Sequence, residues 1–207
     1  MWLALACVVL VGVAAWGQLA SNVEQAKYRV VQSRGDIEIR DYAQMIVAEA
    51  EVQGERKEAI NRGFKIIADY IFGNNSPAQK VAMTAPVIQQ HSNKIAMTAP
   101  VIQQGGGAIW RVRFVMPSSY TLESLPKPNN QAVKLKLLDS ARFAVIRFSG
   151  VATEERLKTR TEDLKKFIHE MQLNSIAEPA YAFFNPPWTL PFLRRNEVMI
   201  QVGLPPT

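Results

Sequence analysis

The sequence predicts an α+β domain: a distorted antiparallel β-barrel of two pseudo-repeats, flanked by two main helices and preceded by an N-terminal hydrophobic helix. The length of 207 residues, with 48% apolar and 20% charged residues, suits one globular domain with a full core. Strand-like and helical segments follow each other in the same order twice. Strands that curl beneath outer helices leave few exposed edges, which favours a barrel-like shape.

The first half of the chain predicts three strands, one long helix and a further strand. Apolar and polar residues alternate in Tyr28–Ser33, Asp36–Tyr42, Gln44–Val52 and Ala108–Pro117, which is the pattern of half-buried strands. A helix is predicted over Glu55–Phe72, because apolar residues recur there at helical spacing. The residues of this apolar stripe are Ile60, Phe64, Ile67 and Ile71.

The second half predicts the same order of elements. A helix is expected over Thr153–Gln172, and Gly54 and Gly150 each end a strand shortly before a helix. The buried stripe of this second helix is Leu157, Leu164, Ile168 and Met171. Its strands are predicted over Val133–Ser140, Ala141–Gly150, Ala180–Asn185 and Glu197–Val202. We therefore expect one domain with an internal repeat, not two domains.

An eleven-residue sequence, here called the doubled phrase, occurs twice, in Lys80–Gln90 and in Lys94–Gln104. The two copies differ at a single position. Alternation within each copy predicts an antiparallel hairpin that turns at Ser92, and a proline in each copy favours a sheet edge. The phrase holds no nucleophile with a neighbouring base, so it does not indicate covalent catalysis. Its methionines, Met83 and Met97, either fill the core or line a site for an apolar ligand.

The first twenty residues carry no charged side chain, and a helix of this length spans about 30 Å, the thickness of a bilayer core. Residues 1–20 are predicted to be a signal-anchor or a cleaved signal peptide, 21–27 a linker, and 28–203 the folded domain. The protein is accordingly expected to be membrane-anchored or exported, on the periplasmic side. The single cysteine, Cys7, excludes an intrachain disulfide and covalent attachment of a c-type haem.

The chain is basic, with a formal charge of +6 and a pI near 9.5. Its Lys and Arg residues are scattered and match no nucleic-acid-binding motif, so a nucleic-acid partner is not expected. Of the two histidines, His91 falls in the predicted turn and is expected to be solvated. The sequence shows no acidic and basic side chains at a spacing typical of a catalytic pair, which argues against an enzyme without excluding one. It identifies no metal ligand.

The segment Phe183–Val202 combines an Asn-Pro-Pro turn with a group of large apolar residues. That group consists of Trp188, Leu190, Phe192 and Leu193. Arg194 either binds a carboxylate of an amphipathic ligand or orders the turn, whereas Arg195 is expected to pair with Glu197 or a backbone carbonyl.

The chain resembles the SOUL haem-binding family, and the resemblance extends from about Tyr28 to Val202. Its most specific part is Asn-Pro-Pro followed by Arg-Arg-Asn-Glu-Val, and bacterial relatives often carry the Met-Thr-Ala-Pro-Val phrase twice. The matching stretches are Phe72–Asn75, Val81–Val87, Phe114–Pro128, Ala144–Gly150 and Phe184–Ile200.

This resemblance implies a distorted barrel flanked by two helices, and non-covalent binding of haem or another tetrapyrrole in an apolar groove against the first helix. By position, the groove face would be Phe64, Ile67, Ala68 and Ile71, to which the patterns above add Met83, Met97 and Arg194. Some vertebrate members have a proposed histidine ligand in the early strands. This chain has no histidine before His91, so axial histidine ligation is not implied.

Three functions follow from these patterns. The leading hypothesis is a non-enzymatic protein that binds haem or a related tetrapyrrole for carriage, buffering or sensing, and contacts the membrane through its N-terminal segment. The alternative is an effector-binding or scaffold module for another hydrophobic ligand or a protein partner. An enzyme acting on a tetrapyrrole or an ester ranks third.

Overall fold

The computed structural model describes residues 24–91, 109–186 and 188–203. The predicted N-terminal helix and the second copy of the doubled phrase lie outside these ranges. Within them, no helix is both long enough and apolar enough to cross a membrane.

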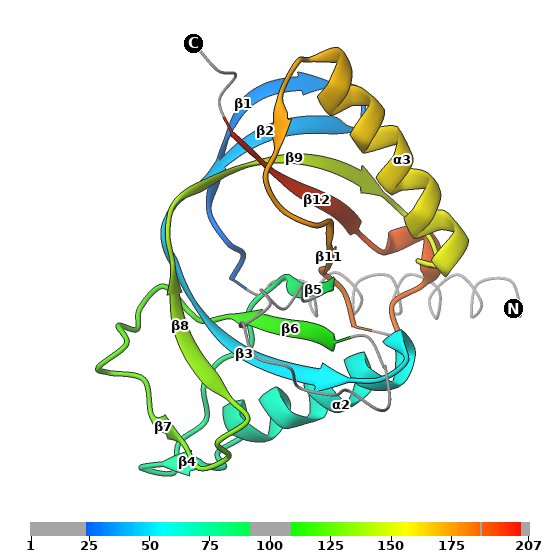
Figure 1. Ribbon diagram of the computed structural model, residues 1–207. Coiled ribbons are helices and arrows are strands. Elements are labelled where there is room, and N and C mark those ends of the chain that lie inside the picture. Colours follow the sequence, from blue (N-terminus) through cyan, green and yellow to red (C-terminus); the bar gives the residue numbers. More distant parts are fainter. Residues whose placement is uncertain (1–23, 92–108, 187, 204–207) are drawn as a thin grey trace, which may run out of the picture.

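One large antiparallel sheet forms the body of the molecule and curls into a half-barrel (Figure 1). A tenth strand, β10 (Asn174–Ser175), pairs with β12, and a separate two-stranded sheet joins β4 (Asn75–Ser76) to β7 (Lys127–Pro128). In sheet order the nine main strands are β1 (Tyr28–Arg34), β2 (Ile37–Tyr42), β9 (Ala141–Phe148), β12 (Asn196–Gly203), β11 (Ala180–Phe183), β5 (Val87–His91), β6 (Ile109–Val115), β3 (Met45–Gln53) and β8 (Lys134–Leu138).

Two helices cover the outside of this sheet, one over each end. Helix α2 (Arg56–Ile71) packs on β3 and β6, whereas α3 (Glu154–Glu170) packs on β9 and β12. Each helix packs on an apolar cluster of its own. Ile67 and Ile71 of α2 pack in one cluster with Val112, and Leu157 and Leu164 of α3 belong to the other. The expected α+β architecture with two flanking helices is confirmed.

The two halves of the chain exchange strands. Two-residue connections join β2 to β3 and β8 to β9, yet β2 pairs with β9, and β3 pairs with β8. The sheet region under α3 therefore contains a strand from the first half, and the region under α2 contains one from the second. The pairing of β11 with β5 joins the two regions into one continuous sheet.

The turns that lead into the helices explain why both begin where the sequence predicts. Gly54 and Gly150 adopt φ values of 129° and 94°, which residues with a Cβ atom rarely adopt. Helix α3 is then capped by Thr153, whose side chain accepts a hydrogen bond from the backbone N–H of Arg156. Thus the two glycines end the preceding strands and allow the chain to reverse into α2 and α3.

The strand predicted across the first copy of the doubled phrase begins later than expected. Regular pairing starts only at Val87, because the residues before it are bound elsewhere. The backbone N–H of Val81 donates to the carbonyl of Ile71 at the end of α2, and the hydroxyl of Thr84 donates to the carbonyl of Val115. His91, expected in a turn, is instead the last residue of β5.

Candidate functional site

The concave face of the curled sheet holds a cavity of about 540 Å³. Strand alternation explains its lining: Ala144 and Ile200 point toward α3, so their neighbours Phe143, Val145 and Met199 point to the opposite face. Residues from both halves of the chain line it. They include Ala26, Tyr42, Met45, Ile88, Gln90, His91, Arg111, Arg113, Phe143, Glu178, Ala180, Met199 and Gln201.

Part of the lining is an apolar floor. Phe143 packs edge-on against Tyr42, with ring centroids 5.6 Å apart and an interplanar angle of 89°. Ala180 and Met199 are almost completely buried beside them, and Ile88 packs against the same cluster. Flat, rigid aromatic surface together with an adaptable thioether suits an apolar ring of variable shape.

Another part of the lining is cationic and comes from β6. The Arg113 Nε lies 2.6 Å from a carboxylate oxygen of the buried Glu49, and Lys136 Nζ lies 2.6 Å from the other oxygen. Burial raises the pKa of Glu49, but the hydrogen bonds from Lys136 and Arg113 outweigh burial and leave that pKa below its usual value. Arg111 Nη2 pairs with Glu51 at 2.7 Å. The pairs hold both guanidiniums in fixed positions on the cavity wall.

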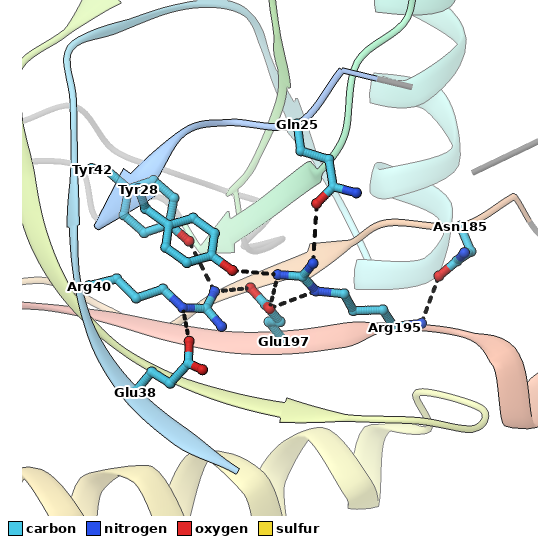
Figure 2. Close-up of polar contacts among 8 residues, drawn as sticks. All are labelled: Gln25, Tyr28, Glu38, Arg40, Tyr42, Asn185, Arg195 and Glu197. Carbon is cyan, nitrogen blue, oxygen red and sulfur yellow. Dashed lines mark hydrogen bonds and ion pairs between the residues drawn. The ribbon is translucent and has the colours of Figure 1, made fainter. Parts of the chain in front are cut away.

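A buried ionic network supports the floor from the side of β12. Glu197 is fully buried; its Oε2 accepts from Arg40 at 2.9 Å, and its Oε1 accepts from Arg195 at 2.7 Å. Figure 2 shows the two arginines pointing at Glu197 from opposite sides, with Tyr28 and Tyr42 beside them. The predicted pairing of Arg195 with Glu197 is confirmed. Because Tyr42 belongs both to this network and to the cavity lining, the network fixes one wall of the cavity.

The residues predicted for the groove on α2 do not line this cavity. Ile67 and Ile71 are fully buried and Ala68 is 8% exposed, so sheet side chains already cover the inner face of the helix. Phe64 lies at the edge of that face, 39% exposed, with its ring centroid 5.2 Å from that of Phe114. On α2, the exposed apolar surface among these four residues is therefore mainly that of Phe64.

The remaining predicted site residues are dispersed. Met83 is 38% exposed in the segment before β5, and Met97 lies outside the described residues. Arg194 donates from Nε to the carbonyl of Thr189 at 2.7 Å, a contact that orders its own loop. Whether Phe64, Met83 and Arg194 contact a ligand stays a prediction.

Sequence reasoning missed the residues that line the cavity, although part of the signal was present. In the predicted strand Ala108–Pro117, Arg111 and Arg113 alternate with apolar residues, which indicates a charged face opposite the helix. His91 also lines the cavity, and its ring packs edge-on against Trp110 at 5.5 Å. Among the described residues, no group of three or more His, Cys, Asp or Glu side chains is arranged to hold a metal ion.

Comparison with known families identifies the class of protein. Residues 23–201 match the family described as SOUL heme-binding protein. The match covers most of the chain, so this protein belongs to the SOUL heme-binding family, as the motifs predicted. No curated protein matches the chain.

Solved structures share the fold at low sequence identity. The C-terminal domain of EcmrR aligns with a TM-score of 0.59 at 9% identity, covering 85% of this chain and 98% of that one. A hydrolase from Listeria innocua aligns with a TM-score of 0.55 at 12% identity, covering 84% and 94% of the two chains. At these identities the likeness concerns the fold alone.

Proposed function

We propose that this protein binds haem or a related tetrapyrrole non-covalently in the concave cavity of its sheet. Membership of the SOUL family supports the ligand class. The observation that carries the location is the combination, in one cavity of about 540 Å³, of an apolar floor with two arginines held on the wall. A volume in this range and an apolar surface combined with fixed polar groups are typical of small-molecule sites. The lining also includes two acidic residues, Asp139 and Glu178.

The chemistry of the lining fits a tetrapyrrole with carboxylate side chains. Phe143, Ile88 and Met199 offer an apolar surface for the ring, while the guanidiniums of Arg111 and Arg113, which already pair with Glu51 and Glu49, would attract the ligand carboxylates by their charge. Haem, when bound, would contribute an iron centre. The thioethers of Met45 and Met199 and the imidazole of His91 are among the groups of the lining that can ligate iron, but stacking and charge attraction require none of them.

The family resemblance implies another location, a groove against α2, where Phe64, Ile67, Ala68 and Ile71 would form the binding face. The exposed apolar residues there are Phe64 on the helix and Phe72 at its C-terminal end, and Met83 is exposed in the segment that follows. The concave cavity has the stronger support, because the inner face of α2 is filled by the core and because fixed cations line the cavity.

Titration of the full chain with haem, followed at the Soret band, tests both the function and its location. Ala180→Phe fills the cavity with an aromatic ring and is expected to weaken haem binding at least about tenfold, since it removes the space for the ligand. Phe64→Ser removes a side chain that does not line the cavity and should leave the affinity unchanged. Circular dichroism and thermal unfolding confirm that both variants fold.

The opposite pattern, a loss with Phe64→Ser but not with Ala180→Phe, would move the ligand to the flank of α2. A full chain that gives no saturable Soret shift with haem or protoporphyrin would refute tetrapyrrole binding. It would then favour the alternative of a module for another hydrophobic ligand or a protein partner.

A further inference from the structure

An exposed group of large apolar side chains, here called the apolar lobe, lies on the connection between β11 and β12. Trp188 is 78% exposed and Phe192 69%, and both lie within six consecutive residues. The four members of the lobe are Trp188, Leu190, Phe192 and Leu193. So many large apolar side chains exposed in one short segment indicate a surface that contacts something other than water.

The lobe is held in place by the backbone around it. The carbonyl of Pro191, in the short helix η1 (Pro191–Leu193), accepts from the backbone N–H of Gly150 at 2.8 Å and of Arg194 at 3.1 Å. Inside the loop, the N–H of Leu193 donates to the carbonyl of Leu190, and Arg194 Nε donates to the carbonyl of Thr189. The apolar side chains are thus presented by an ordered loop, and their exposure does not result from a frayed chain end.

The start of the folded domain is bonded to a residue that closely follows the lobe in the chain. Arg195 Nη1 donates to Gln25 Oε1 at 3.1 Å, and Arg195 follows the last lobe residue by only two positions (Figure 2). Gln25 is in turn five residues beyond Ala20, the last residue of the predicted N-terminal hydrophobic segment. Five residues span at most about 18 Å when extended, so that segment ends within this reach of Gln25.

We propose that the apolar lobe inserts into the interfacial region of a lipid bilayer, next to the place where residues 1–20 enter it. The inference rests on the membrane insertion of residues 1–20 and is independent of tetrapyrrole binding. A bilayer that holds those residues would keep Gln25 near its surface, and with it the loop that ends at Arg195. Trp is enriched at the membrane–water interface, and Phe and Leu are the residues with which interfacial segments enter the acyl boundary.

Spin-label accessibility in protein-free vesicles tests this directly. Cys7 is the single cysteine, so the full chain with Cys7→Ser accepts one label through Phe192→Cys in the lobe. Phe72→Cys is the matched control, because Phe72 is 64% exposed and immediately follows α2. In vesicles of phosphatidylcholine and phosphatidylglycerol, we expect collisions with a water-soluble nickel complex to be several-fold lower at position 192 than at 72, and collisions with oxygen to be higher.

A further variant separates insertion from a local structural effect. Adding Trp188→Ser and Leu193→Ser to the labelled Phe192→Cys chain should restore the water accessibility of the label, while leaving the control position unchanged. Equal accessibility at positions 192 and 72, or a chain that does not sediment with the vesicles, overturns the proposal. Either result would favour a protein partner as the occupant of the lobe.

Discussion

Arg40 on β2 and Glu197 on β12 form an ion pair, with 2.9 Å between Nη1 and Oε2, across the strand β9 that separates them. The two side chains are 2% and 0% exposed. Removing charges from water is costly, and such a pair persists only when further hydrogen bonds complete its coordination. Glu38, Tyr42 and Arg195 supply these bonds, so the network connects the N-terminal region to the last strand.

Replacing Glu197 should destabilise the fold strongly. In Glu197→Gln, the buried guanidinium of Arg40 loses its charged partner on β12, and breaking a buried pair in this way typically costs about 3 kcal/mol or more. Urea unfolding monitored by circular dichroism measures the free energy of unfolding. Asp163→Asn, which breaks an exposed pair with Arg160 on α3, is the control and should cost less than about 1 kcal/mol. Equal losses in the two variants would contradict the importance of the buried network.

The stability of the protein should fall at alkaline pH because of Tyr42. Burial, followed by the negative charge of Glu197, raises the pKa of Tyr42 to about 12. The unfolded chain releases this proton near pH 10 whereas the folded chain keeps it, so the free energy of unfolding falls between pH 10 and 12, by roughly 2–3 kcal/mol. Urea unfolding of Tyr42→Phe between pH 9 and 12 should show a decline that is shallower by that amount. Parallel curves would refute the assignment.

The contact between α2 and β6 should not tolerate a side chain at Gly63. A Cβ atom there would lie 2.6 Å from Val112 Cγ2, and overpacking of this kind costs about 1–3 kcal/mol. Alanine improves helix propensity by about 1 kcal/mol, so Gly63→Ala should still lose stability, by roughly 1 kcal/mol overall. Asn61→Ala on the exposed side of α2 gains propensity without a clash and should not destabilise. A stabilised Gly63→Ala in thermal unfolding would show that α2 can move away from the sheet.

If tetrapyrrole carboxylates pair with β6, Arg111→Met should discriminate between ligands. A hydrogen bond to a charged group contributes about 1.5–3 kcal/mol, so the affinity for protoporphyrin IX should fall about tenfold or more. Its dimethyl ester carries no carboxylates and should bind the variant and the parent chain equally. Fluorescence titration of both ligands measures this, with Arg160→Met on α3 as the control. An equal loss for both ligands would indicate that Arg111 acts through the shape of the cavity.

The sequence was informative where its pattern depends on local geometry. The helices predicted over Glu55–Phe72 and Thr153–Gln172 run over Arg56–Ile71 and Glu154–Glu170, because periodic apolar residues fix their length and the preceding glycines fix their start. The alternating strand Gln44–Val52 was likewise recovered as β3. By contrast, the two-residue strands β4, β7 and β10 carry too few residues for any pattern to be detected.

The candidate site was harder to predict because it depends on contacts between distant strands. The periodicity of α2 indicated an apolar face, but it could not distinguish a face that packs on a sheet from one that receives a ligand, and Ile67 and Ile71 belong to the first kind. Ile88, Phe143 and Met199 meet at the cavity only through the register of their strands and the curvature of the sheet. The spacing of residues in a single sequence does not predict the curvature of the sheet.

The exchange of β2 and β8 between the two halves restricts how such a chain can be divided. Cutting it in the connection between β6 and β8 would give two fragments, each with a helix but with part of its helix-covered sheet on the other fragment: β1 and β2 for α3, and β8 for α2. A single half expressed by itself would leave an unpaired edge where that partner belongs. Both halves must therefore be present together for either helix-covered region of the sheet to be complete.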